Sequence, residues 1–437
     1  MLGNEGALKE GAVTTRHWGG PAGGASSDPP PRAPALAAEI PQLAREGGAY
    51  THIRPGEEVR QELKHPTPPD RSAPLAGWTL AVKDLIAIAG RPLIGGSRAR
   101  EGVPAEARDA PIVAVLRRLG AVVVGTTTLH ELAFGVTGVN VYAGTPSNPA
   151  APGAIPGGSS SGSAAAVGEG SARIALGTDT GGSVRIPAAL CSVVGFKPSY
   201  AAYPTAGVLP LAPSLDHLGV LARSVGDVCT VHAALGHSLA APRARPRIGL
   251  IKASLEDAEP EVAETIARLL ELAARSGCTL VEIGWPEPEL VIHSSTTIMF
   301  AEAAIVHREI LERCPELLGE DVRARLDTGA AIGSAALTEA ERERVAIRAD
   351  TIRAFEGLDC VVGPTVGILP PPLAVAEEAS LGLRLVANTR LANLVGIPAV
   401  SLPIGAPGAP VGLQVMARAD DSALTAAAWI EQLAARE

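Results

Sequence analysis

Aromatic side chains are scarce in this sequence. Phe, Trp and Tyr together make up 3% of its 437 residues, although hydrophobic residues reach 46%. A buried core must therefore be built from Ala, Val, Leu and Ile. The length allows one large domain or two to three ordinary ones. Glycine and proline are plentiful by contrast, with 48 and 37 copies, and they indicate many turns and close backbone approaches.

Cysteine is also sparse. The five cysteines lie far apart, are odd in number and form no CxxC pair. This pattern argues against a disulfide scaffold and favours a reducing, cytoplasmic location. No metal-ligand spacing or phosphate-binding motif is found in the sequence either, so we expect no metal and no cofactor.

Two further features are missing. No run of about 18 apolar residues is free of charge, and no apolar segment follows the charges near the N-terminus, so neither a membrane span nor a secretion signal is predicted. The formal net charge is −9 and no basic stripe stands out, which argues against direct contact with nucleic acid. The expected partner is a small molecule, and a homodimer remains open.

The two ends of the chain differ in character. Residues 1–40 are low in complexity, with the Gly/Pro/Ser-rich stretch "GGPAGGASSDPPPRAP", and such a composition cannot bury enough apolar surface to order itself. We therefore predict a disordered tail over residues 1–40 and one folded domain over residues 41–437.

Helical and strand-like patterns alternate along the rest of the chain. "WTLAVKDLIAIAG" predicts a strand that ends near Lys83, and "DAPIVAVLRRLGAVVVG" predicts a helix followed by a strand. The second half continues with a strand at "RIGLI", a helix at "EVAETIARLLELAARSG", and long helices around Met299–Cys314 and Leu337–Phe355. Such alternation is typical of an α/β fold in a single large domain.

The stretch "PGGSSSGSAAAVGEG" (156–170) allows three interpretations. A flexible linker would explain its composition, but an alanine-rich helix follows at once. A phosphate cradle would need a Lys-Ser/Thr pair to close the glycine loop, and none is present. The pentapeptide GSSSG matches the G-x-S-x-G elbow of hydrolases, but prolines precede it where that elbow needs a central strand.

Two other segments could take part in catalysis, but each also has a plain structural explanation. In "GTDTGGSVRIPAA", two glycines before Ser183 leave backbone N–H groups free to bind an oxyanion beside a nucleophile; a Ser-capped turn would have the same sequence. Lys83 follows an apolar strand, where partial burial would lower its pKa and make it a base. It could equally form an ion pair with Asp84.

Taken together, these stretches resemble the amidase signature family of amide hydrolases. The resemblance rests on "PLAGWTLAVKDLIAIAG", "PGGSSSGSAAAVG" and "ALGTDTGGSVRIPAALCSVVGFKPSY", and it extends over roughly residues 73–437. It implies one amidase-signature domain, in which helices flank a central mixed β-sheet.

The resemblance also implies a Ser–cis-Ser–Lys triad. Ser183 would be the nucleophile, Ser159 the bridging serine with a cis peptide bond, and Lys83 the base. The backbone N–H groups of Ser183 and of the residues before it, Thr180, Gly181 and Gly182, would hold the oxyanion. Phe134 and Gly135 would lie near the leaving group.

The implied activity is cleavage of a small carboxylic acid amide to an acid and ammonia or an amine through an acyl-enzyme. An alternative within the family is the glutaminase (A) subunit of a tRNA-dependent amidotransferase, and a protein that keeps the fold without catalysis is a second one. A Ser-His-Asp hydrolase would instead need His217 or His307. Four arginines lie in the region expected to shape the pocket, where one could bind a carboxylate, but they are predicted to lie on solvated helix faces: Arg308, Arg323, Arg325 and Arg390.

Overall fold

The structure is a computed structural model that describes residues 48–64, 72–241, 245–406 and 408–435. The tail predicted for residues 1–40 and the first residues of the predicted domain lie outside the described residues. The five cysteines all fall within the described part of the chain and are free.

A single mixed β-sheet runs through the described residues, with strand order β1-β3-β2-β4-β6-β5-β10-β11-β9-β7-β8. The pairs β2/β3, β2/β4, β7/β8 and β7/β9 are parallel, and the other neighbours are antiparallel. The strands are β1 (Tyr50–Ile53), β2 (Thr79–Lys83), β3 (Val122–Thr127), β4 (Ile174–Asp179), β5 (Val194–Lys197), β6 (His217–Ala222), β7 (Arg247–Leu250), β8 (Thr279–Glu282), β9 (Cys360–Pro364), β10 (Ala399–Pro403) and β11 (Gly412–Met416).

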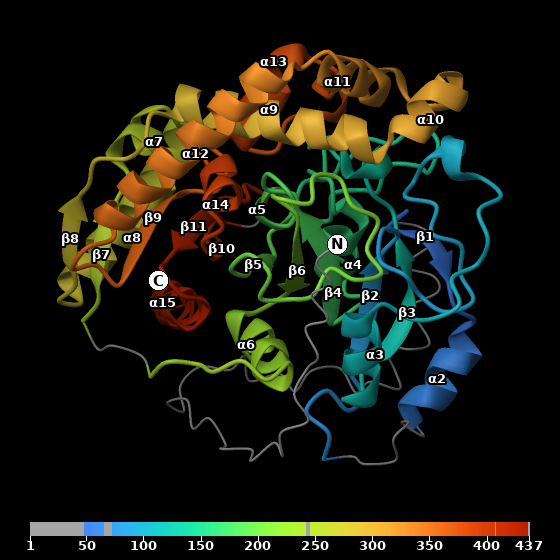
Figure 1. Cartoon of the computed structure of the whole chain (residues 1–437). Coiled ribbons are helices and arrows are strands. Elements are labelled where there is room, and N and C mark those ends of the chain that lie inside the picture. Colours follow the sequence, from blue (N-terminus) through green and yellow to red (C-terminus); the bar gives the residue numbers. More distant parts are fainter. Residues whose placement is uncertain (1–47, 65–71, 242–244, 407, 436–437) are drawn as a thin grey trace.

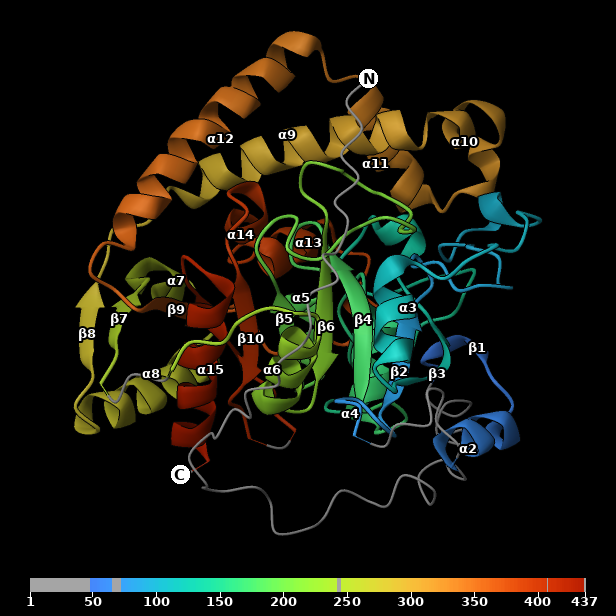
Figure 2. The ribbon, with the colours of Figure 1, turned by 60° about the horizontal axis from the view of Figure 1, so that its bottom comes forward.

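Helices pack on both faces and along one end of this sheet (Figure 1). They are α2 (Gly56–Lys64), α3 (Pro111–Arg118), α4 (Ser161–Gly168), α5 (Arg185–Leu190), α6 (Val225–Ala234), α7 (Lys252–Glu256), α8 (Pro260–Arg275), α9 (Pro288–Val306), α10 (Arg308–Arg313), α11 (Glu320–Ala330), α12 (Ser334–Ala354), α13 (Ala379–Val386), α14 (Arg390–Leu394) and α15 (Asp420–Ala434). Figures 1 and 2 both show α9, α11 and α12 together beyond the ends of the strands.

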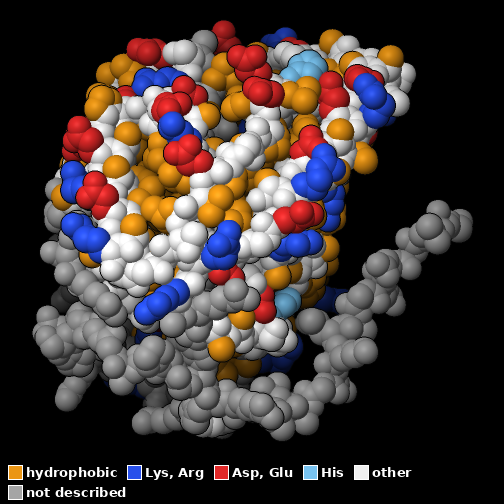
Figure 3. All heavy atoms as spheres, turned by 90° about the vertical axis from the view of Figure 1, so that its left-hand side faces the viewer, with side chains coloured by type: hydrophobic (Ala, Val, Ile, Leu, Met, Phe, Trp, Pro, Cys, Tyr) orange, Lys and Arg blue, Asp and Glu red, His pale blue; other side chains and the backbone are white. Residues whose placement is uncertain are grey.

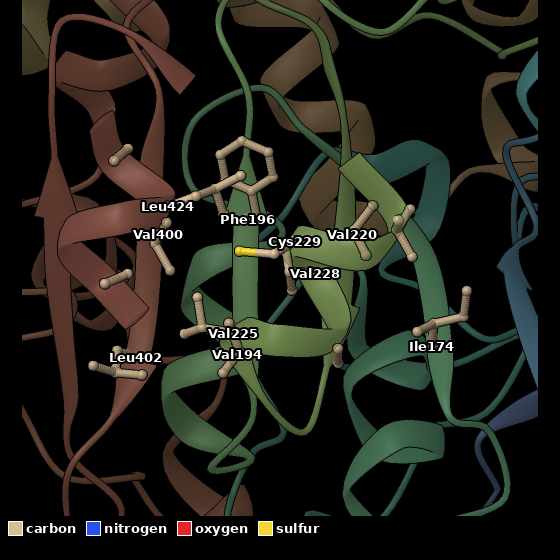
Figure 4. Packing of buried hydrophobic residues seen from close by; sticks show 14 of the residues in the cluster. Ile174, Val194, Phe196, Val220, Val225, Val228, Cys229, Val400, Leu402 and Leu424 are labelled. Atoms are coloured by element: carbon tan, nitrogen blue, oxygen red, sulfur yellow. The ribbon is translucent and has the colours of Figure 1, made fainter. Parts of the chain in front are cut away.

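Alternate residues of the strands face two different helical layers, as the pleat of a strand requires. Leu80 and Val82 of β2 join the cluster formed with α3, α6, α8 and α15, and Figure 4 shows the side chains of α6 and α15 packed on β5, β6 and β10. Ala81 faces the opposite layer, where it meets the buried alanines of α4. These small side chains let α4 approach the sheet closely, so larger residues there would overpack the core.

Helix α8 illustrates how the sequence specifies a surface helix. Pro260 occupies its first turn together with Glu261, and Arg275 lies in its last turn, an arrangement that suits both the free N–H groups and the helix dipole. The helix buries a stripe of apolar residues at helical spacing against the sheet: Val262, Ile266, Leu269, Leu270 and Ala273.

The helix predicted over Met299–Cys314 is wrong in its bounds. α9 begins eleven residues earlier, at Pro288 (299 − 288 = 11), and the chain bends at His307 before α10. The start was missed because "HSSTT" (293–297) consists of poor helix formers. Packing against α11, α12 and α14 overrides this local preference. β1, α2, β5 and β6 were not predicted either.

The apolar composition of α9 has a structural explanation. It is the one helix among the described residues that is long and apolar enough to cross a membrane. Its buried residues include Ile298 and Met299, which pack with residues of α11 and α12 in one cluster, so α9 acts as a core helix.

Over the described part of the face where β8 lies, acidic and basic side chains are interspersed (Figure 3).

Candidate active site

Lys83 is the last residue of β2, and its side chain is fully buried. Its Nζ donates to three hydroxyl oxygens: Ser159 Oγ at 2.7 Å, Ser160 Oγ at 3.0 Å and Thr178 Oγ1 at 2.7 Å. Burial lowers the pKa of Lys83 from 10.5 to about 7, although the more distant charges of Asp179 and Asp216 oppose this shift. The alternative interpretation, an ion pair between Lys83 and Asp84, is not seen, because the three bonds of Nζ all go to hydroxyl groups. Lys83 can therefore supply a neutral amine near neutral pH.

The serine-rich stretch forms a tight loop that leads directly into α4. The peptide bond between Gly158 and Ser159 is cis, as the family resemblance implies. Gly157 has a φ of +74°, and a Cβ on Gly158 would lie 2.7 Å from the backbone nitrogen of Gly138. Only glycines fit this double constraint. The loop brings the Ser159 hydroxyl to Lys83, and Ser160 ties it to β4 because its Oγ donates to the Thr178 carbonyl oxygen at 3.1 Å.

Ser183 lies in the turn between β4 and α5 and is 5% exposed. The Asp179 carboxylate, at the end of β4, accepts hydrogen bonds from the N–H groups on both sides of Ser183: Gly182 at 2.9 Å and Val184 at 3.0 Å. The Ser183 carbonyl oxygen accepts from the Ser160 N–H at 3.1 Å. The two serine loops are thus joined through their backbones. No hydrogen bond links the Ser159 and Ser183 hydroxyls in the described residues.

A buried ion pair holds this turn in place, and the sequence analysis did not identify it. Arg185 and Asp179 are both 0% exposed and form a double hydrogen bond, through Nη2 at 2.9 Å and Nε at 3.1 Å. Arg185 also donates to Gln414 Oε1 and Asn393 Oδ1, each at 2.6 Å. Burial raises the Asp179 pKa, but Arg185, Lys197 and the Val184 N–H together hold it far below its usual range. The sequence does contain an indication of this ion pair, because Asp179 and Arg185 lie on either side of the Gly-Gly-Ser turn in an otherwise apolar stretch.

The predicted oxyanion residues surround Ser183, with one correction. The Gly182 N–H, expected to face a reacting oxygen, instead donates to Asp179. The N–H groups of Gly181 and Ser183 have no protein acceptor among the described residues. Thr180 is fixed because its Oγ1 donates to Asp216 Oδ1 at 2.6 Å. The Thr180 N–H likewise has no protein acceptor among the described residues, so three of the four predicted N–H groups are available to an anion.

Phe134 and Gly135 belong to a loop that contacts the serine-rich loop through its backbone: the Ser159 carbonyl oxygen accepts from the His130 N–H at 3.1 Å, and the Val136 carbonyl oxygen accepts from the Gly158 N–H at 2.7 Å. The Phe134 ring packs edge-on against Phe300 of α9, and its carbonyl oxygen accepts from Arg325 Nη1 at 2.7 Å. A Cβ on Gly135 would collide with the His130 ring. No hydrogen bond in the described residues joins either residue to Lys83, Ser159 or Ser183.

A cavity lies between β4 and the loop before β6. Its polar wall includes Thr178, Thr180 and Asp216, and its apolar wall includes Leu85 and Leu209. Thr178 binds Lys83 and Thr180 precedes the Ser183 turn, so this cavity lies beside the segment of β4 that connects these two groups. Burial raises the pKa of Asp216 above its usual range.

The two histidines considered as alternatives are buried and uncharged. His217 Nδ1 donates to the Leu215 carbonyl oxygen at 2.7 Å, and desolvation keeps its pKa well below the usual value. Burial lowers the pKa of His307 to about 4. Neither forms a hydrogen bond with Ser183 in the described residues, and no group there could hold a metal ion.

Of the four arginines expected on solvated faces, only Arg308 and Arg323 are exposed. Arg325 is half-buried and pairs with Asp321 at 2.6 Å. Arg390 is also half-buried and lies against Gly181. The expectation is thus wrong for Arg325 and Arg390, since Arg325 packs on the Phe134 carbonyl oxygen and Arg390 on Met299 of α9.

Comparison with known proteins gives a consistent result. The family model for amidases matches residues 57–425. The indoleacetamide hydrolase of Pseudomonas savastanoi is 33% identical over 387 residues, which cover 83% of this chain and 84% of that protein. The A subunit of the glutamyl-tRNA(Gln) amidotransferase of Methanothermobacter thermautotrophicus is 32% identical over 383 residues, with 82% and 84% covered. The crystal structure of an amidase superposes with a TM-score of 0.83 at 33% identity, over 92% of this chain and 96% of that one.

Proposed function

The chain belongs to the amidase family of amide-hydrolysing enzymes, and from that membership we propose that it converts a small carboxylic acid amide to the acid and ammonia or an amine through an acyl-enzyme on Ser183. Lys83 is the base, and Ser159 carries protons between Lys83 and Ser183. The observation that supports this most directly is the fully buried Lys83, bound only to hydroxyl groups, with a pKa of about 7.

The first half of the reaction forms an ester and releases the amine. Neutral Lys83 accepts the proton of Ser159 while Ser159 accepts that of Ser183, and Ser183 Oγ attacks the amide carbonyl carbon. The hydroxyl contact between the two serines forms as substrate binds, because catalytic hydrogen bonds are often long in the free enzyme. The C–N bond then breaks, and the proton returns through Ser159 to the departing nitrogen.

The second half consumes water. A water molecule gives its proton to the Ser159–Lys83 pair and attacks the ester carbonyl carbon, and Ser183 recovers its proton as the acid leaves. In both halves the negative oxygen receives hydrogen bonds from the Gly181 and Ser183 N–H groups. Each donor of this kind stabilises the transition state by about 3–4 kcal/mol. Asp179 keeps the turn in the shape that points these groups at the oxygen.

The test is ammonia release from a panel of aliphatic, aromatic and dicarboxylic amides by wild type and by Ser183→Ala. Wild type should release ammonia and the acid in equal amounts, and Ser183→Ala should lose on the order of 10³-fold or more in turnover. Ser199→Ala is a matched control outside the site, since Ser199 pairs with Asp420. Equal activity in wild type and Ser183→Ala would refute the proposal.

A second candidate is the glutaminase component of a tRNA-dependent amidotransferase, which the likeness to the Methanothermobacter thermautotrophicus protein favours. The segment between Thr365 and Asn388 opposes it, because it is short and lacks the acidic and aromatic pattern expected there. A partner protein that co-purifies, together with glutaminase activity that depends on it, would support this candidate. Turnover of simple amides by the purified chain alone would support the first.

A further inference from the structure

The side chain of Arg390 lies directly on the turn that carries Ser183. A Cβ added to Gly181 would come within 3.1 Å of Arg390 Cδ, 3.2 Å of its Nε and 3.0 Å of Met299 Cε. Gly181 precedes Ser183 by two residues, a separation that an extended chain can stretch to about 7 Å at most. The guanidinium is therefore within the reach of a short substrate held at Ser183.

This guanidinium has almost no partners. Its Nη1 points to the Met299 sulfur at 3.4 Å, a weak acceptor, and its Nε is buried without an acceptor. No carboxylate pairs with Arg390 among the described residues. Burial, reinforced by the charge of Arg325, lowers the pKa of Arg390 to about 10, so the group remains cationic at neutral pH.

The neighbouring Arg325 shows the contrast. Its Nη1 bonds to the Asp321 carboxylate at 2.6 Å and to the Phe134 carbonyl oxygen at 2.7 Å. The Asp321 carboxylate thus balances the charge of Arg325, whereas no carboxylate among the described residues balances that of Arg390. A buried cation without a counter-charge is costly to keep, and a bidentate carboxylate is the ligand that best satisfies a guanidinium.

We propose that Arg390 binds a carboxylate group of the substrate, so that the enzyme acts on amides that also carry a carboxylate a few bonds from the scissile carbonyl. This inference rests on the proposed function, because it places the reacting carbonyl at Ser183. The carboxylate can belong to the acyl part, as in the monoamide of a dicarboxylic acid, or to the amine part, as in an N-acyl amino acid.

Titration calorimetry on the Ser183→Ala variant, which cannot turn the ligand over, tells whether the enzyme prefers a carboxylate in the acyl part or in the amine part of the substrate. Succinamate is compared with neutral succinamide for the acyl part, and N-acetylglycine with N-acetylglycinamide for the amine part. We expect one of the two carboxylates to bind roughly 10- to 100-fold more tightly than its neutral counterpart. Adding Arg390→Gln should abolish that preference, and Arg390→Lys should retain part of it.

Arg323→Gln in the same background is the matched control, since it removes one positive charge from an exposed position of α11 and should leave the preference intact. Circular dichroism melts verify that each variant is folded. The proposal is overturned if neither carboxylate binds more tightly than its neutral counterpart, or if the preference survives Arg390→Gln. A preference that depends on Arg390 in a wild-type enzyme that releases neither ammonia nor an amine from any amide tested would uphold the carboxylate site and refute the proposed reaction instead.

Discussion

Replacing Lys83 by Arg should abolish activity although it keeps the positive charge. With a pKa of about 7 instead of 10.5, about half of the Lys83 amines are neutral at pH 7, whereas about 1 in 3000 would be at the unshifted value. Burial therefore increases the amount of free base by about 10³-fold. An arginine has no neutral form in this range and cannot accept the Ser159 proton. We expect Lys83→Arg, like Lys83→Ala, to lose on the order of 10³-fold or more in turnover.

The assay is ammonia release between pH 5 and 9, with the best substrate of the amide panel. For wild type, kcat/KM should rise tenfold per pH unit below about pH 7 and level off above it, because the free base increases in that way. Lys252→Arg is the matched control, since Lys252 is exposed and pairs with Glu256. A folded Lys83→Arg enzyme with near-normal turnover, or a wild-type rate that is flat below pH 7, would refute the role of Lys83.

Four further outcomes are expected. A fluorophosphonate should label Ser183, and peptide mapping that finds the adduct on the serine-rich loop would revive the elbow interpretation. His217→Asn and His307→Asn should each keep at least roughly a tenth of the wild-type turnover, because only a Ser-His-Asp mechanism would require one of these histidines. Asp179→Asn should lower the free energy of unfolding by about 3–5 kcal/mol in denaturant titrations, because it leaves the buried Arg185 charge without its partner. For Lys83, the unfolded chain binds more protons than the folded one between about pH 7 and 10.5, so the stability of wild type minus that of Lys83→Met should rise by about 1.4 kcal/mol per pH unit across this window, and a difference that falls would contradict the lowered pKa.

The sequence was most informative where local chemistry dictates local structure. The strand before Lys83, the glycines around Ser159 and the turn before Ser183 each have patterns that only a few backbone shapes satisfy. The family resemblance joined these three segments, which periodicity alone could not have done. The α/β class followed from the alternation of helical and strand-like patterns, although short strands such as β5 and β6 escaped it.

Long-range contacts were beyond the reach of the sequence. Nothing near Arg185 indicates that its guanidinium binds Gln414, because that residue lies 229 positions further along the chain. The bounds of α9 were missed since packing outweighed propensity. Arg390 was expected in water for a similar reason: a charged residue next to a helical pattern resembles a solvated face until the covering helices are known.

The ion pair between Asp179 and Arg185 has a consequence for the synthesis of the protein. Arg185 completes its hydrogen bonds with Gln414, which lies 229 residues further along the chain. A nascent chain on the ribosome that already contains Lys83, Ser159 and Ser183 therefore still lacks Gln414, an acceptor that helps to hold the Ser183 turn. Because domains fold as units, a chain that stops short of β11 should carry an inactive hydroxyl. Amide cleavage is thus withheld until almost the whole polypeptide has been made.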